Sequence, residues 1–176
     1  MTEPLFNRHF DWFWRVSLAQ FITFIFFIAN IVSFSMPEAG LVRPYFILIA
    51  IYYWSIYRPT FLSPLFIFIL GLLYDLILAY PLGLHSIIFI AVQWIVISQR
   101  LFFLGQSYMA VWLSFACLLF GVSGVEWLFF CFYLGSIVSF KAVFFSFLVT
   151  LFIFPLMTTI LVMAHRILPS ESRSYF

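Results

Sequence analysis

Charged residues are scarce in this sequence of 176 residues. It contains eight Lys and Arg and six Asp and Glu, which together make up 8% of the chain, whereas a soluble domain is usually about 25% charged. So few charges cannot cover the surface of a water-soluble globule, which excludes a soluble enzyme. Nucleic-acid binding is excluded as well, because it requires a basic surface. Hydrophobic residues form 66% of the chain, which excludes an intrinsically disordered protein.

The sequence also lacks the common signatures of catalysis and metal binding. It has no P-loop, no H-E-x-x-H and no Cys/His metal spacing, so we expect no cofactor and no metal. The segment Gly121-Val122-Ser123-Gly124 resembles the nucleophile motif of rhomboid proteases, and His165 follows it. In the predicted spans these two residues differ in depth by roughly 20 Å at 1.5 Å per residue. We therefore predict that the protein is not an enzyme.

Long apolar runs dominate the chain and predict an all-α membrane protein with about six transmembrane helices. A span needs roughly 20 apolar residues, and continuous runs argue against a transmembrane barrel. The predicted spans are residues 16–36, 41–57, 61–79, 84–103, 107–134 and 141–164. Segment 107–134 is too long for one straight span, so one bent helix and a helix with a re-entrant piece both remain open. The predicted organisation is a tail (1–15), a single transmembrane domain (16–166) and a second tail (167–176).

The basic residues predict how the protein is oriented. With six spans, one side of the membrane holds six of the eight: Arg8, Arg15, Arg58, Arg100, Arg166 and Arg173. The other side holds Arg43 and Lys141. Because cytoplasmic loops are enriched in Lys and Arg, both termini are predicted to be cytoplasmic.

A few ionisable residues fall inside the predicted spans, where each costs about 2.5–3.5 kcal/mol on insertion scales. We predict two linked sets on the outer half: Asp75 with His85 and Arg43, and Glu126 with Lys141. Two interpretations remain open, namely pairs that fix helix packing and a polar pocket or partner-docking patch. Gly71, one turn before Asp75, predicts a close helix approach on that face.

Other polar and aromatic side chains have simpler predicted roles. The polar residues within the spans are expected to form hydrogen bonds between helices. They are Ser17, Gln20, Thr23, Asn30, Gln93, Ser146, Thr150 and Thr158. The aromatic residues near span ends are typical of an interfacial belt. They are Trp12, Trp14, Tyr52, Tyr53, Trp54, Tyr57 and Trp94.

The middle of the chain resembles one known family. The segments that carry the resemblance are Arg43-Pro44-Tyr45, Tyr53-Trp54-Ser55-Ile56-Tyr57-Arg58-Pro59, Gly71-Leu72-Leu73-Tyr74-Asp75-Leu76 and Pro81-Leu82-Gly83-Leu84-His85. Their order and spacing are similar to those of the rod shape-determining protein MreD family. Asp75 and the Pro81–Gly83–His85 turn match the signature segment of that family, which assigns them no chemical role.

The resemblance implies a function that composition does not show. MreD proteins are multi-pass components of the bacterial inner membrane that support lateral peptidoglycan synthesis and cell shape. They act with MreC, the MreB cytoskeleton, the RodA glycosyltransferase and its transpeptidase partner. The implied fold is similar to the six-helix substrate-binding subunit of energy-coupling-factor transporters. We therefore expect a non-enzymatic scaffold of the elongasome that binds MreC.

Several alternatives stay open at this point. A substrate-binding subunit of a vitamin or lipid transporter is the second hypothesis, although no Ala-x-x-x-Ala docking patch occurs near Ala19 and Ala29. A cavity lined by Arg43 or Lys141 could also accept an anionic or prenyl-linked lipid, because basic pockets between spans bind head groups. Membrane lipids are expected partners, and the sequence leaves homo-oligomerisation open.

Overall fold

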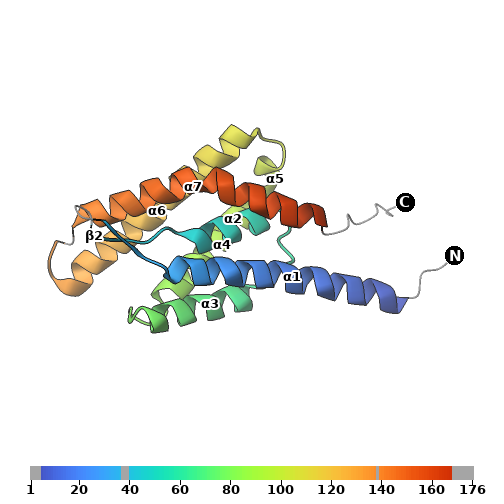
Figure 1. Ribbon diagram of the computed structural model, residues 1–176, viewed down its shortest axis with the longest axis horizontal. Helices are drawn as coiled ribbons and strands as arrows, with labels where there is room; N and C mark the ends of the chain where they lie inside the picture. The colour runs from blue at the N-terminus through green and yellow to red at the C-terminus, as the bar shows by residue number, and fades with distance from the viewer. Residues whose placement is uncertain (1–4, 37–39, 138, 168–176) are drawn as a thin grey trace.

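The computed structural model describes residues 5–36, 40–137 and 139–167, which form seven helices and one short antiparallel hairpin (Figure 1). The long helices are α1 (Leu5–Ile31), α6 (Tyr108–Leu134) and α7 (Phe140–Ile167). The shorter helices are α2 (Phe46–Tyr57), α3 (Pro64–Ile77), α4 (Leu84–Ser98) and α5 (Arg100–Phe103). The hairpin pairs β1 (Phe34–Met36) with β2 (Gly40–Val42). These elements confirm the predicted all-α membrane protein.

The helices differ in whether they are long enough to cross a membrane. In the described residues, α1, α6 and α7 each contain an apolar stretch of sufficient length. The helices α2, α3 and α4 have only 12, 14 and 15 residues, fewer than the roughly 20 that a span usually needs. Three of the six expected spans are therefore short helices that lie between longer ones.

The predicted second span, 41–57, is helical only from Phe46 onward. Pro44 has no N–H and disfavours helical geometry at Arg43, and the Phe46 N–H closes a tight turn on the Pro44 carbonyl at 3.1 Å, so the helix begins only after this turn. At the other end of the chain, α1 already begins at Leu5, inside the segment expected to be a tail. Segment 107–134 is one helix, α6, and Gly135 closes it with a φ of 61°.

The most buried element is α2, which lies at the centre of the bundle and contacts α1, α4 and α7. Every residue from Phe46 to Ile56 is buried. A helix that is apolar on all sides requires such a position. The interfacial-belt prediction is therefore wrong for Tyr52, Tyr53 and Trp54, which are core residues, whereas Trp94 is 72% exposed on α4.

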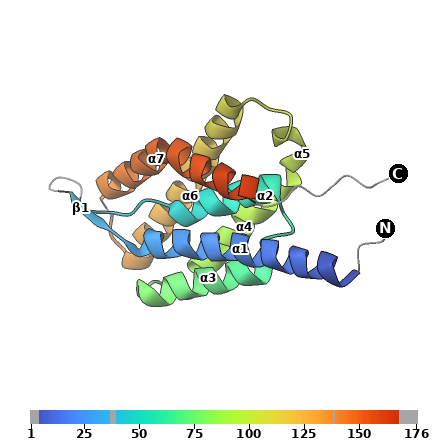
Figure 2. The same ribbon diagram turned by 45° about the vertical axis from the view of Figure 1, so that its right-hand side comes forward.

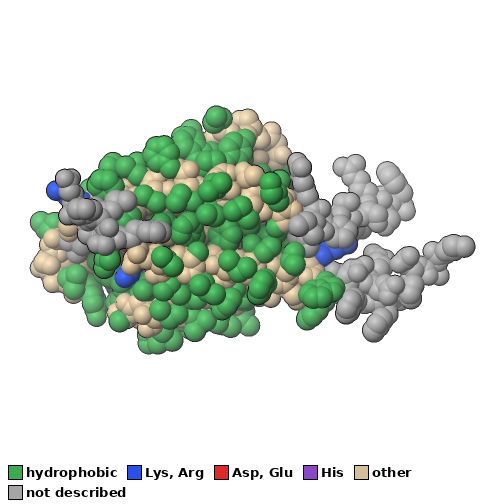
Figure 3. Space-filling view, in the orientation of Figure 1, with side chains coloured by type: hydrophobic (Ala, Val, Ile, Leu, Met, Phe, Trp, Pro, Cys, Tyr) green, Lys and Arg blue, Asp and Glu red, His purple; other side chains and the backbone are tan. Residues whose placement is uncertain are grey.

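The bundle has two distinct ends. The first turn of α1 and the last turn of α7 lie at one end, while the hairpin and the α3–α4 and α6–α7 connections lie at the other, here called the hairpin end (Figures 1 and 2). Hydrophobic side chains cover most of the face shown in Figure 3, and the visible Lys and Arg side chains lie towards its ends. Exposed apolar residues of this extent indicate contact with lipid.

Candidate functional site

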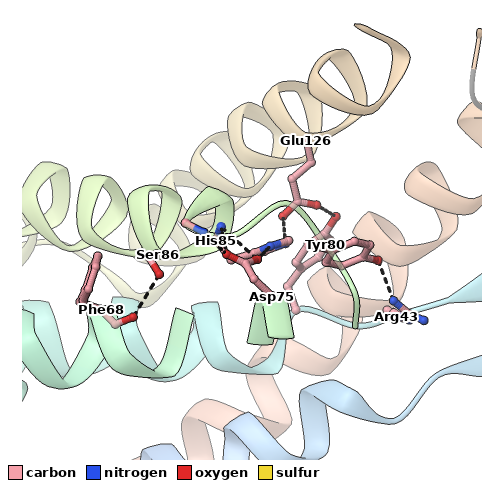
Figure 4. A network of polar contacts seen from close by, with 9 residues as sticks. Arg43, Phe68, Asp75, Tyr80, His85, Ser86 and Glu126 are labelled. Carbon is pink, nitrogen blue, oxygen red and sulfur yellow. Dashed lines mark hydrogen bonds and ion pairs between the residues drawn. The ribbon is translucent and has the colours of Figure 1, made fainter. Parts of the chain in front are cut away.

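The buried carboxylate of Asp75 caps the N-terminus of α4. Asp75 lies near the end of α3 and is 0% exposed. Its Oδ2 accepts a hydrogen bond from the Gly83 N–H at 2.8 Å, and its two oxygens lie 3.3 Å from the His85 backbone nitrogen that donates to them (Figure 4). The first N–H groups of a helix have no acceptor within the helix and carry partial positive charge. Asp75 of α3 therefore supplies hydrogen-bond acceptors to the first N–H groups of α4.

Two glycines allow this close arrangement. A Cβ on Gly71 would lie 2.4 Å from Ser86 Cα, so only glycine lets α3 approach the α4 backbone here. The Ser86 hydroxyl donates to the Phe68 carbonyl at 3.1 Å across the same contact (Figure 4). Gly83 has a φ of 92°, in the region that favours glycine, and it is the third residue of the turn from Pro81 to Leu84.

His85 joins Asp75 to Glu126 of α6. Its Nδ1 lies 2.6 Å from Asp75 Oδ1 and its Nε2 lies 3.2 Å from Glu126 Oε1, so both ring nitrogens face carboxylate oxygens. A neutral imidazole donates from one nitrogen only. His85 of α4 therefore lies between two carboxylate side chains, one from α3 and one from α6.

Two tyrosines extend the contacts of this group. The Tyr45 hydroxyl donates to Glu126 Oε2 at 2.6 Å. The Tyr80 ring stacks on His85 with ring centroids 5.2 Å apart, and Arg43 Nη1 donates to the Tyr80 hydroxyl at 2.6 Å (Figure 4). We call these six residues the polar network: Arg43, Tyr45, Asp75, Tyr80, His85 and Glu126. It joins the segment before α2, the α3–α4 turn and α6 at the hairpin end.

The Tyr80 hydroxyl stays neutral beside Arg43. Tyr80 lies in the turn between α3 and α4, outside the membrane-spanning helices. Burial raises the pKa of its hydroxyl above the ordinary value of 10.0, although the charge of Arg43 acts in the opposite direction. Tyr80 therefore accepts a hydrogen bond from the guanidinium without neutralising its charge.

Side chains from other helices also accept hydrogen bonds from the backbone N–H groups at and just before the start of α2. The Arg43 N–H donates to the Ser146 hydroxyl at 3.0 Å, and the Tyr45 N–H donates to the Thr150 hydroxyl at 2.9 Å. From α1, Asn30 Oδ1 accepts from the Ile47 N–H at 3.2 Å. Asn30 therefore joins two helices, as the sequence predicts, and Ser146 and Thr150 bond to the connection before α2. The prediction is wrong for Thr23, whose hydroxyl donates to the Ala19 carbonyl of its own helix at 2.8 Å.

The structure changes the predicted pairings of the charged residues. It brings Asp75 and His85 together as predicted, but the Arg43 guanidinium bonds to Tyr80 instead of to Asp75. The predicted Glu126–Lys141 pair is wrong. Among the described residues, Glu126 contacts His85 and Tyr45, while Lys141 is exposed at the start of α7. A buried carboxylate is stabilised better by rigid neighbours of similar depth than by a flexible lysine at the helix end.

The described residues hold no group of three His, Cys, Asp or Glu side chains with the geometry of a metal site. Ser123 is buried, and among the described residues its hydroxyl has no hydrogen bond to His85 of the kind that a Ser/His dyad requires. The side chain of His165 lies outside the described residues. Sequence reasoning missed Tyr45 and Tyr80, although both lie in the motif segments or directly before Pro81.

The comparisons with known proteins decide the family. A model of the rod shape-determining protein MreD family matches residues 12–166. The chain belongs to the MreD family. The match includes the whole polar network, and it identifies this MreD-family chain as a membrane protein that determines cell shape. No curated protein and no solved structure matches it, so the likeness to energy-coupling-factor subunits stays a prediction.

Proposed function

We propose that this MreD-family chain is a non-enzymatic scaffold of the elongasome that binds MreC and supports lateral peptidoglycan synthesis. Membership of the family supports this role, and the polar network is the structural observation that carries it. The network fixes the α3–α4 turn against α2 and α6, and so gives the hairpin end a defined surface. A partner binds a preorganised surface at a lower entropic cost than a mobile one.

The proposed orientation places the termini in the cytoplasm of the bacterial inner membrane and the hairpin end outside. It rests on the Lys and Arg distribution of the sequence, and on the position of the first turn of α1 and the last turn of α7 at the same end (Figure 1). MreC would then contact the helix faces and the hairpin end. RodA with its transpeptidase partner, and MreB, are the further proposed members of the complex.

The test is co-purification of tagged protein with MreC after coexpression. We expect wild type to retain MreC and Asp75→Leu to lose it, because leucine leaves the N–H groups of Gly83 and His85 without their acceptor. Each unsatisfied buried group costs about 1–3 kcal/mol. Leu65→Ala is the control, since Leu65 is 68% exposed on the same helix and lies at its start, away from the hairpin end.

A melting curve of each purified variant separates folding from binding. Capture of MreC by a folded Asp75→Leu variant at the wild-type level would contradict the role assigned to the network. If Asp75→Leu does not fold, Asp75→Asn is used for the same measurement of MreC capture, because it keeps one acceptor oxygen while removing the charge. Failure of wild type itself to retain MreC would refute the scaffold proposal.

A further inference from the structure

A cavity of about 250 Å³ lies beside the polar network at the hairpin end. Its walls come from β2, the segment before α2, the α3–α4 turn, α6 and α7. The polar part of the lining contains Arg43, Tyr45, Tyr80, Glu126 and Ser146, and the apolar part includes Trp127 and Phe130. The cavity therefore combines one cation, one carboxylate and aromatic walls.

In the part of the chain that the structure describes, the cation of this cavity has no anionic partner. Among the described residues, no carboxylate lies within ion-pair distance of the Arg43 guanidinium. Its Nη1 donates to the neutral Tyr80 hydroxyl, and its Nε is buried without an acceptor. A buried donor without an acceptor carries a desolvation penalty, which a bound acceptor would remove.

The carboxylate of the cavity keeps one oxygen available. Glu126 accepts the Tyr45 hydrogen bond through Oε2, whereas its buried Oε1 lies 3.2 Å from His85 Nε2 and has no hydrogen-bond partner. Among the described residues, the cavity therefore presents both an unmet donor, Arg43 Nε, and an unmet acceptor, Glu126 Oε1. A ligand with an anionic oxygen and a hydroxyl group supplies partners to both without breaking the Tyr45 contact.

We propose that this cavity binds a phosphate ester, with its anionic oxygens on Arg43 and its apolar part against Trp127 and Phe130. The guanidinium fork matches phosphate oxygens, and charge-assisted hydrogen bonds are the stronger kind. A pocket for a drug-sized ligand is about 300–1,000 Å³, so this smaller cavity suits a single head group. The ester is either a phospholipid head group or a soluble phosphate ester.

The site goes beyond the scaffold role, because that role as proposed assigns no ligand to the cavity. The sequence offers two basic residues, Arg43 and Lys141, for such a cavity, and Arg43 lines it. Lys141 is exposed and does not line the cavity, so it provides a control with the same loss of charge.

The experiment is native mass spectrometry of the purified protein in detergent, titrated with phosphatidylglycerol. We expect wild type to retain one tightly bound lipid and Arg43→Gln to bind it about 10- to 150-fold more weakly, because the variant loses a charge-assisted hydrogen bond to the lipid. Lys141→Gln should bind as wild type does, and Arg43→Lys should recover part of the affinity.

A second variant keeps the test valid if Arg43→Gln does not fold. Ala142 lines the cavity without making any of the network hydrogen bonds, so Ala142→Phe fills the space and leaves Arg43 in place. We expect this variant to lose the bound lipid as well. Lipid retention equal to wild type in a folded Arg43→Gln or Ala142→Phe variant would overturn the proposal.

Glycerol 3-phosphate distinguishes the two sources of the ester. Displacement of the lipid by millimolar glycerol 3-phosphate assigns the site to soluble esters, whereas persistence of the lipid assigns it to a phospholipid head group. If wild type binds neither probe, the proposal is wrong. Co-purification of MreC with Arg43→Gln is measured in parallel. A variant that loses the lipid but retains MreC shows that the ligand site and the scaffold role are separate.

Discussion

Asp75 shows how a membrane protein accommodates a charge that is costly on its own. The carboxylate lies among backbone N–H donors and one imidazole, not beside a guanidinium. The scarcity of charges in the sequence was enough to identify Asp75, His85 and Glu126 as residues that need partners. It could not identify backbone amides as those partners, because every residue type except proline carries one.

Gly71 is the residue at which a single methyl group should matter most. We expect Gly71→Ala to destabilise the protein by about 1–3 kcal/mol, since the added Cβ would lie 2.4 Å from Ser86 Cα and must push α3 away from α4. Chemical unfolding of the detergent-solubilised protein measures this change.

Gly121→Ala is the matched control for that substitution. Gly121 also lies within a helix, but a Cβ there would meet nothing within 4 Å. Its stability should stay the same or rise slightly, because alanine favours helix more than glycine does. Equal stabilities of the two variants would show that α3 and α4 are not in tight contact.

At the scale of elements, α2 depends on its neighbours for the hydrogen bonds at both ends. Side chains of α1 and α7 accept from the backbone at its start, and Arg100 Nε donates to the Ile56 carbonyl at 2.8 Å near its end. The apolar run of 41–57 predicts the presence of this helix but not its central position. A transmembrane span and a short core helix have the same composition, and only the length from Phe46 separates them.

Thr150 allows a direct test of this dependence. We expect Thr150→Val to lower the free energy of unfolding by about 1 kcal/mol, because it leaves the half-buried Tyr45 N–H without an acceptor. Thr159→Val, on the exposed face of the same helix, should have little effect, since Thr159 bonds only to the Pro155 carbonyl of its own helix. Thermal melting of both variants decides, and equal melting temperatures would contradict the role of Thr150.

At the scale of the whole molecule, the Lys and Arg distribution and the ends of the bundle agree on one arrangement. The sequence sorted the basic residues into two groups by assuming six crossings of the membrane. The structure has shorter central helices than that assumption used, yet the first turn of α1 and the last turn of α7 still share one end (Figure 1). That these two turns share one end follows from the number of apolar segments, not from their exact lengths, and the side of the membrane on which they lie stays a prediction.

Single cysteines test this arrangement in the membrane. In a background with Cys117→Ala and Cys131→Ala, we expect Leu82→Cys to react with an impermeant maleimide in intact spheroplasts. Gly105→Cys should react only after lysis, because it lies in the exposed connection between α5 and α6 at the other end. The cysteine-free parent gives the background labelling, and the reverse pattern would place the termini outside.

The long sequence separation of the contacts around α2 has a consequence for synthesis of the protein. Ser146 and Thr150 follow the amides that they accept from by 103 and 105 residues. At about 5–20 residues per second, the ribosome makes them roughly 5–20 s after the start of α2. The central helix α2 is thus synthesised early, but the hydrogen bonds that join its start to α7 can form only after α7 has been synthesised. Maturation waits for the last helix, and a chain released before α7 lacks the acceptors that its core helix requires.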